Sequence, residues 1–362
     1  METLKETDIK VTREKLPDVL KGFGIMLVVL GHCIQVGSGA EFNTESRYFS
    51  DKLYQFIYSF HMPLFMMVSG YLCWGSMKRA LDGRQRLILL KRRILALPVP
   101  IFVWTALEFL IKTVINLSND NVLSWRIICD YLYSVLNNFW FLWAVFWCFL
   151  IVFIMHFYFH DSIILYILGF LTLFFIPDGM ALGAYKYMMP YFIAPFYLHK
   201  YMEQRKVSLD NAPKIKWIAL TGLVFIVLFL FFDESSFIYL SGYKLIGKDM
   251  ISAVRQLKID FYRMAVGFVG SAFFILLWQY IINKFKNKCE FKLMSALGKD
   301  SMGIYILSTY ILSYVVQNIY RMSQPNYLLN LAQAVIVIAV SLLLTELIGL
   351  IPIPIMRKLV GK

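Results

Sequence analysis

The chain has 362 residues, of which 59% are hydrophobic and only 16% are charged. A soluble globular protein is about 45–50% apolar and about 25% charged, so this composition excludes an ordinary soluble fold and indicates a membrane protein. The net charge of +13 does not indicate nucleic-acid binding, because the basic residues lie in short loops between apolar segments, where they orient helices.

The first apolar segment, residues 18–36, carries three titratable side chains on one helical face, Asp18, Lys21 and His32, and Val28 falls on that face too. No charged residue separates Lys21 from His32, which lies 11 residues and about 16 Å further along an α-helix. An ionisable group inside a membrane is costly and is therefore a candidate for function. We expect His32 to act as a base or a nucleophile. The alternative is a histidine that only hydrogen bonds to a neighbouring helix.

The second apolar segment, residues 54–77, contains His61 followed by Pro63. This segment runs antiparallel to the first, so His61 and His32 are expected at similar depth. Imidazole titrates near neutral pH, which suits acid–base catalysis, and His61 is predicted to orient or assist His32. An interfacial histidine without catalytic function is the alternative. Pro63 is expected to bend the helix.

The third apolar segment, residues 87–116, has charged residues near its start. Arg92 and Arg93 are followed directly by the apolar run. Guanidinium groups bind phosphate oxygens through paired hydrogen bonds. These two residues therefore predict the binding of an anionic cytoplasmic cosubstrate. Alternatively, they only fix the orientation of the helix.

Two further residues are candidates for substrate binding. Trp140 follows two asparagines at the start of an apolar segment, and is either part of an interfacial aromatic belt or a platform for a sugar. Arg263 enters the eighth segment beside Asp260, and either lines the site or extends its charge to the interface. The polar stretch 233–260 is expected to be an external loop. No metal-binding motif or nucleotide-binding motif is present in the sequence, so no metal is predicted.

The apolar segments predict an all-α fold, a polytopic membrane bundle of about ten transmembrane helices that forms one domain over residues 1–362. The segments are 18–36, 54–77, 87–116, 138–159, 161–177, 187–199, 215–232, 261–282, 301–320 and 328–351. When alternate loops are assigned to the cytoplasm, they hold 25 of the 36 Lys and Arg residues. This bias predicts cytoplasmic termini in the inner (cytoplasmic) cell membrane, with lipid around the bundle.

Five motifs in this order resemble the acyltransferase 3 family of integral membrane acyltransferases, near its fucose O-acetylase-like and polysaccharide-modifying branch. They are Lys21 to His32, Phe60-His61-Met62-Pro63-Leu64-Phe65, Arg92-Arg93 with Pro98, Asn138-Phe139-Trp140, and Leu297 to Tyr305. The resemblance implies about ten helices, a cytoplasmic acyl-CoA donor and a glycan hydroxyl as acceptor. It also implies that His32 is the essential histidine. Lys21, where the family commonly has Arg, takes a supporting role.

The sequence therefore predicts a membrane O-acyltransferase that moves an acyl group, most simply acetyl, from acyl-CoA to a surface glycan or lipid-linked saccharide. Acetyl-CoA or another acyl-CoA is a cosubstrate, and no bound cofactor is expected. The predicted residues are catalytic His32 and His61, CoA-binding Lys21, Arg92 and Arg93, and substrate-binding Trp140 and Arg263. The alternative is a glycan or proton-coupled solute transporter with the histidines as a proton relay. The lack of a visible inverted repeat argues against it.

Overall fold

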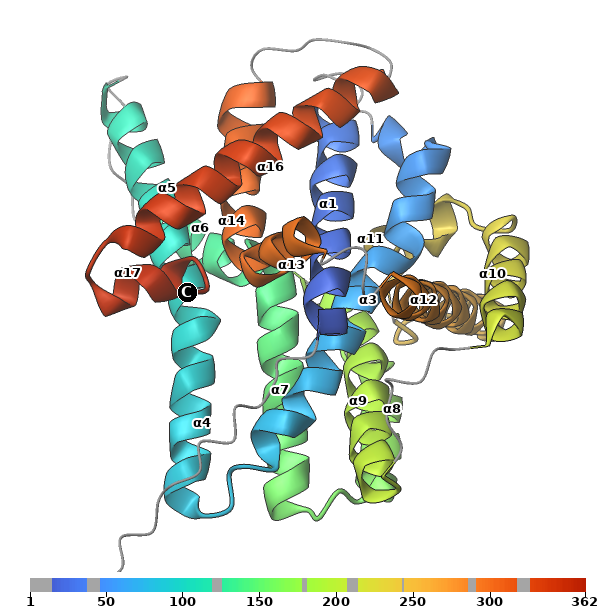
Figure 1. The fold of residues 1–362 in the computed structure, drawn as a ribbon. Helices are drawn as coiled ribbons and strands as arrows, with labels where there is room; N and C mark the ends of the chain where they lie inside the picture. Colours follow the sequence, from blue (N-terminus) through green and yellow to red (C-terminus); the bar gives the residue numbers. More distant parts are fainter. Residues whose placement is uncertain are drawn as a thin grey trace, which may run out of the picture.

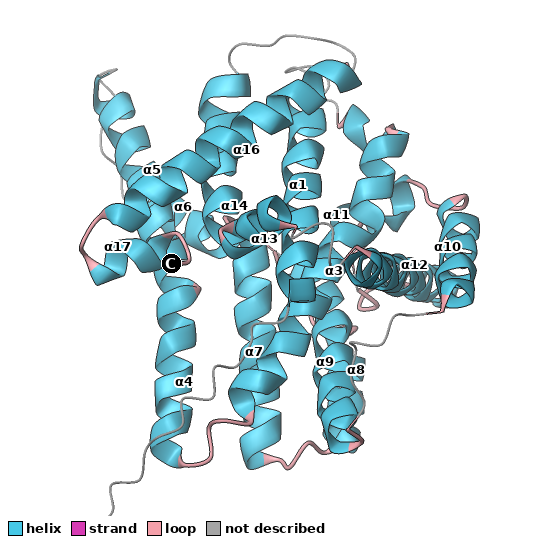
Figure 2. Ribbon diagram, in the orientation of Figure 1, coloured by secondary structure: helices cyan, strands magenta, loops and turns pink. Residues whose placement is uncertain are grey.

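The computed structural model describes residues 15–37, 46–118, 126–177, 181–206, 214–242, 244–285, 291–317 and 326–362. Every regular element in these ranges is a helix, which confirms the all-α prediction (Figure 2). The helices at the predicted apolar segments are α1 (Lys15–Gly37), α3 (Lys52–Met77), α4 (Gly83–Ala96), α5 (Pro98–Ser118), α7 (Trp140–Tyr158), α8 (Ile163–Leu173), α9 (Leu182–Gln204), α10 (Ile215–Phe229), α12 (Met250–Lys284), α14 (Ser301–Ile311) and α16 (Tyr327–Leu350). The connecting elements are η1 (Arg47–Ser50), α6 (Arg126–Asn137), η2 (Glu234–Ser236), α11 (Ile238–Ser241), α13 (Lys292–Lys299), η3 (Leu312–Val316) and α17 (Pro354–Leu359).

Six helical segments of the described chain are long and apolar enough to cross a membrane. They are α1, α3, α4 together with α5, α7, α12 and α16. Three further apolar helices, α8, α10 and α14 continued by η3, are shorter. Each of the ten predicted segments therefore contains a helix, and six of these helices are candidate membrane spans.

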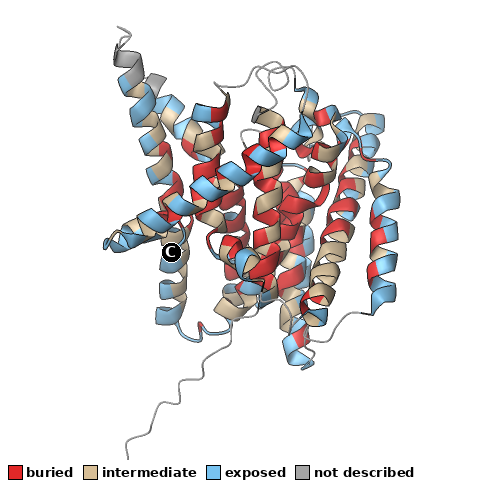
Figure 3. Ribbon diagram, turned by 45° about the horizontal axis from the view of Figure 1, so that its top comes forward, coloured by how far each residue is buried: buried red, intermediate tan, exposed pale blue. Residues whose placement is uncertain are grey.

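The distribution of side chains is that of a protein surrounded by lipid. Long apolar side chains such as Leu223 and Phe231 are exposed, while Gln55, Asp260 and Arg263 are buried. Buried residues concentrate in the central helices, and exposed residues lie on the outer faces of the peripheral helices (Figure 3). Ionisable groups in a membrane protein face the interior of the bundle, as Asp260 and Arg263 do. The chain is a helical membrane protein.

Helix α1 lies in the centre of the bundle, where it packs against α3, α13, α14 and α16 (Figure 1). The backbones of α1 and α13 are in direct contact. A Cβ on Gly298 would lie 1.8 Å from the carbonyl oxygen of Asp18, and a Cβ on Gly22 would lie 2.0 Å from that of Met294. Only glycine permits this approach. This close contact holds the start of α1 against α13. Because α14 follows α13 directly, the start of α1 also lies beside α14.

Two predicted boundaries are wrong. The third segment is not one helix: α4 ends before Leu97 and α5 begins at Pro98, because proline lacks the N–H that a continuous helix needs. The polar stretch 233–260 is not all loop, because α12 begins at Met250, where the carboxylate of Asp249 accepts a hydrogen bond from the backbone N–H of Ser252 at 3.3 Å.

Candidate active site

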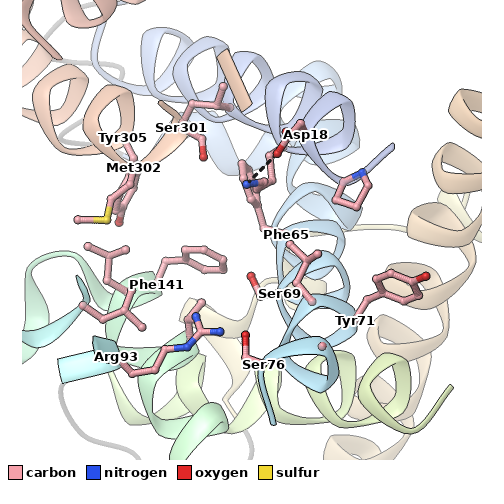
Figure 4. A pocket seen from close by; sticks show the side chains of 18 of the residues that line it. Asp18, Phe65, Ser69, Tyr71, Ser76, Arg93, Phe141, Ser301, Met302 and Tyr305 are labelled. Carbon is pink, nitrogen blue, oxygen red and sulfur yellow. Dashed lines mark ion pairs between the residues drawn. The ribbon is translucent and has the colours of Figure 1, made fainter. Parts of the chain in front are cut away.

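A cavity of about 620 Å³ lies between α1, α3, α4, α7 and α14. We call it the basic cavity, because Lys21, Lys78, Arg79 and Arg93 are among its lining residues. Figure 4 shows the Arg93 side chain on one wall of this cavity, across from Asp18. The ionised groups thus surround a space large enough for a ligand.

Helix α1 contributes one face to the basic cavity. Asp18, Lys21, Ile25 and Val28 all line it, which confirms that Lys21 and Val28 share a helical face. The Lys21 ammonium lies 3.4 Å from the carboxylate of Asp18, which is buried. His32 follows Val28 by one turn on this face and is half-buried.

The two predicted arginines differ in position although they are adjacent. Arg93 is half-buried and lines the basic cavity, with its guanidinium 5.2 Å from the centre of the Phe149 ring. Arg92 is exposed and is not among the lining residues. Adjacent residues on a helix point about 100° apart, so one arginine can face the cavity while the other faces outward.

His61 is completely buried in α3, next to Met62, which lines the basic cavity. Its Nδ1 lies 2.7 Å from the backbone carbonyl oxygen of Ile57. A carbonyl only accepts, so Nδ1 carries the proton and donates it, and Nε2 of the neutral ring is left as an acceptor. The imidazoles of His61 and His32 are close enough to interact electrostatically. The structure therefore brings the two predicted histidines together.

Tyr58 is a residue of this site that sequence reasoning missed. Its ring meets the His61 ring edge to face, with the centroids 4.6 Å apart. A Cβ on Gly31, the residue before His32, would lie 2.8 Å from the Tyr58 ring, so Tyr58 packs on the backbone of α1. Its position three residues before His61, one turn along the helix, is the signal that could have identified it.

A second cavity of about 600 Å³ is lined by parts of α6, α7, α9, α11 and the start of α12. We call it the aromatic cavity, because Trp140 and Tyr239 line it with their ring centroids 6.2 Å apart. Tyr58 contacts Phe237, two residues before Tyr239, with the ring centroids 6.2 Å apart, and it contacts His61, whose neighbour Met62 lines the basic cavity. Tyr58 therefore lies between the two cavities.

Arg263 does not line the aromatic cavity; it lies behind two residues that do. Its guanidinium forms a buried ion pair with Asp260 and donates a hydrogen bond to Ser241 Oγ at 2.9 Å. Asp260 also accepts a hydrogen bond from Gln256 Nε2 at 2.8 Å. Ser241 and Gln256 both line the cavity. The structure thus places Arg263 where it holds cavity residues in position.

The edge of the basic cavity is fixed by ion pairs. The Lys78 ammonium lies 2.5 Å from Glu203, whose other oxygen accepts a hydrogen bond from the Trp74 indole. In the nearby loop after α7, burial raises the pKa of the Asp161 carboxyl. Hydrogen bonds from His156, Lys200 and other donors more than offset this, so the pKa lies well below its usual range. These pairs hold the ends of α3, α7 and α9 together.

Within the described residues, no group of three His, Cys, Asp or Glu side chains is arranged to hold a metal ion. The candidate site groups His32, His61 and Tyr58 near the basic cavity and the aromatic cavity, although neither histidine is among the residues that line them. This arrangement suits proton transfer and the binding of an anionic ligand beside it.

The chain belongs to the acyltransferase 3 family of membrane acyltransferases, since the family's acyltransferase domain matches residues 15–349. Nodulation protein NolL of Sinorhizobium fredii is 33% identical over 134 residues, which cover 37% of this chain and 34% of NolL. NolL of Mesorhizobium japonicum is 31% identical over 137 residues, with 37% and 34% covered. The chain thus aligns with about a third of the length of these relatives. No solved structure matches it.

Proposed function

We propose that this acyltransferase is an O-acyltransferase that transfers an acyl group, most simply acetyl, from acyl-CoA to a hydroxyl of a surface glycan or lipid-linked saccharide. The observation that carries the proposal is the basic cavity, which is lined by Val28, one turn before His32, and by Met62, the residue after His61. CoA is a polyanion, and Arg93, Lys21, Lys78 and Arg79 supply cations around one space. The proposal assigns the CoA phosphates to this cavity and the acceptor to the aromatic cavity, with Trp140 as a platform for the sugar.

In the proposed topology the protein lies in the inner membrane of the cell and crosses it ten times. Both termini are in the cytoplasm. This topology places the start of α1, the end of α3 and the start of α4 on the cytoplasmic side, where acyl-CoA is made. The starts of α7 and α9 then face outward, where a surface glycan would arrive. On this topology the cytoplasmic ends of α1 and α3 line the basic cavity, and the outer end of α9 lines the aromatic cavity, which supports the assignment of donor and acceptor.

In the proposed mechanism His32 is the general base. The acceptor hydroxyl gives its proton to His32, and its oxygen bonds to the thioester carbonyl carbon. The C–S bond then breaks and the released CoA thiolate takes up a proton. His61, whose Nδ1–H is held by Ile57, presents Nε2 toward this centre, and the Tyr58 hydroxyl orients the reacting groups.

The alternative role of His32 as a nucleophile has a separate test. An acyl-histidine would form when His32 attacks the thioester and CoA leaves, and the acceptor hydroxyl would then displace the imidazole. Acid quenching of the enzyme with radiolabelled acetyl-CoA, in the absence of acceptor, would trap such a species on the protein. Turnover without any trapped label favours direct transfer.

The proposed function is tested with purified protein in lipid nanodiscs, radiolabelled acetyl-CoA and glycan-containing membrane extracts. We expect acetyl-CoA-dependent labelling of glycan, and His32→Ala should lower its rate by about 10²–10⁴-fold, the usual contribution of general acid–base catalysis. His160→Asn is the matched control. His160 is exposed, and its backbone has the left-handed conformation (φ 49°), which Asn tolerates. Glycan uptake into vesicles without any acyl donor, and no labelling, would contradict the proposal.

A further inference from the structure

The charged side chains that line the aromatic cavity are all positive. Lys244 and Lys248 line it, and none of its lining residues is Asp or Glu. In the described part of the chain, no ion pair joins either lysine to a carboxylate. The cavity therefore presents two cations that the protein itself does not neutralise.

The nearest acidic side chains are already engaged. Asp260 is buried and pairs with Arg263, so this pair adds no net charge to the cavity. Asp249 follows Lys248 in sequence, but its carboxylate accepts a hydrogen bond from the backbone N–H of Ser252 at 3.3 Å and caps α12. Asp249 keeps its negative charge, but neither it nor Asp260 is among the residues that line the cavity.

The neutral part of the lining suits a saccharide. Trp140 and Tyr239 provide ring surface, and Asn137 and Gln256 provide amide groups that both donate and accept hydrogen bonds. A small number of polar groups among aromatic surfaces is typical of a specific ligand pocket. Polyhydroxylated rings offer the matching apolar faces and hydroxyl groups.

We propose that the aromatic cavity selects an acidic saccharide, in which Lys244 and Lys248 bind a carboxylate on the sugar or a phosphate that links it to lipid. This inference rests on the proposed function, since it names the chemical class of the acyl acceptor. The acceptor would lie against Tyr239, two residues after Phe237, whose ring contacts Tyr58 beside His61. Its hydroxyl would thus face the histidines while its acidic group is held by the lysines.

The test measures equilibrium binding in nanodiscs without any acyl-CoA. One pair of probes is a tetrasaccharide with one glucuronate and its counterpart with glucose; a second pair is the glucose form on a prenyl phosphate and on an uncharged prenyl alcohol. At low salt we expect roughly a tenfold preference for the anionic member of at least one pair, as two exposed charge pairs would give. The pair that shows it identifies carboxylate or phosphate as the source. The preference should weaken as salt is added.

The variants separate charge from folding. Lys244→Ala with Lys248→Ala should abolish the preference, and Lys244→Arg with Lys248→Arg should keep it. Lys216→Ala on α10, an exposed lysine outside the cavity, is the control and should change nothing. Equal affinity within both pairs, or a preference that survives the double alanine substitution, would overturn the inference. Because no acyl donor is present, such a result leaves acyl transfer itself untouched.

Discussion

At the scale of single residues, the site depends on how each imidazole is oriented. His61 uses Nδ1 to bind the carbonyl of Ile57 in its own helix, so its tautomer is fixed by backbone geometry. His32 has greater exposure and follows the cavity face of α1. One histidine is thereby held rigidly, while the other follows Val28, a lining residue of the basic cavity, by one turn of helix. This difference supports His32 as the proposed base and His61 as the orienting group.

The adjacent arginines give a matched test of the basic cavity. Arg93→Ala should raise the KM for acetyl-CoA by about tenfold to a hundredfold, the range for loss of a hydrogen bond to a charged group. Arg92→Ala removes the same charge one residue away, on the exposed side of α4, and should have a much smaller effect. The measurement is initial rate against acetyl-CoA concentration for both variants. Equal effects of the two substitutions would contradict binding of CoA in the cavity.

Tyr58 can be tested without loss of its packing. Tyr58→Phe keeps the ring against Gly31 and Tyr54 but removes the hydroxyl, and should lower kcat about tenfold or more with little change in the KM for acetyl-CoA. Tyr262→Phe is the control, because the Tyr262 hydroxyl donates its hydrogen bond to the carbonyl oxygen of Leu228 on α10 and its ring has no described contact with either histidine. Steady-state kinetics decide between the alternatives: an unchanged kcat would leave Tyr58 with a packing role only.

At the scale of elements, α12 shows how a long helix can carry charge into a membrane. Gln256, Asp260 and Arg263 lie on its buried face at spacings of four and three residues. Gln256 donates a hydrogen bond to Asp260, and Asp260 forms an ion pair with Arg263. Arg263 also donates a hydrogen bond to Ser241 on α11. The cost of burying these charges is offset only while the set is complete.

Removal of one member should therefore be costly. Arg263→Met leaves Asp260 buried without its cation and should destabilise the protein by about 3–5 kcal/mol, the range for breaking a buried ion pair. Arg255→Met, on the same helix but exposed, should have little effect. Thermal unfolding in detergent measures both variants, and we expect Asp260→Asn added to Arg263→Met to restore part of the loss. Equal stability of the two single variants would show that the pair contributes nothing.

At the scale of the whole molecule, the proposed topology places the two cavities on opposite sides of the membrane. In a variant without native cysteines, Lys248→Cys should react with a membrane-impermeant maleimide in intact cells. Arg205→Cys, at the end of α9, should react only after permeabilisation, because basic loops stay in the cytoplasm. Labelling is read by a mass shift on gels. The reverse pattern would exchange the sides assigned to donor and acceptor.

Part of the site was predictable because it depends on local chemistry. The cost of an ionisable group in a membrane singled out His32 and His61, and helical periodicity placed Lys21 on the cavity face of α1. Motif order identified the family that the acyltransferase domain match confirms. The helix break at Leu97 and the start of α12 at Met250 were not predicted, because hydropathy averages over a window, whereas helix ends are set by single residues.

Hydropathy, charge and helical period by themselves determined that this chain is an all-α membrane protein with one histidine in each of its first two apolar segments, His32 and His61. These properties are local, so they can be read along the chain. Only the tertiary structure decided that Arg93 rather than Arg92 faces the cavity, that Tyr58 packs against both the His61 ring and the backbone of α1, and that Glu346 pairs with Lys362 at 2.5 Å. Such contacts depend on how each helix is rotated about its axis and which helix packs beside it, and neither is encoded in any single segment.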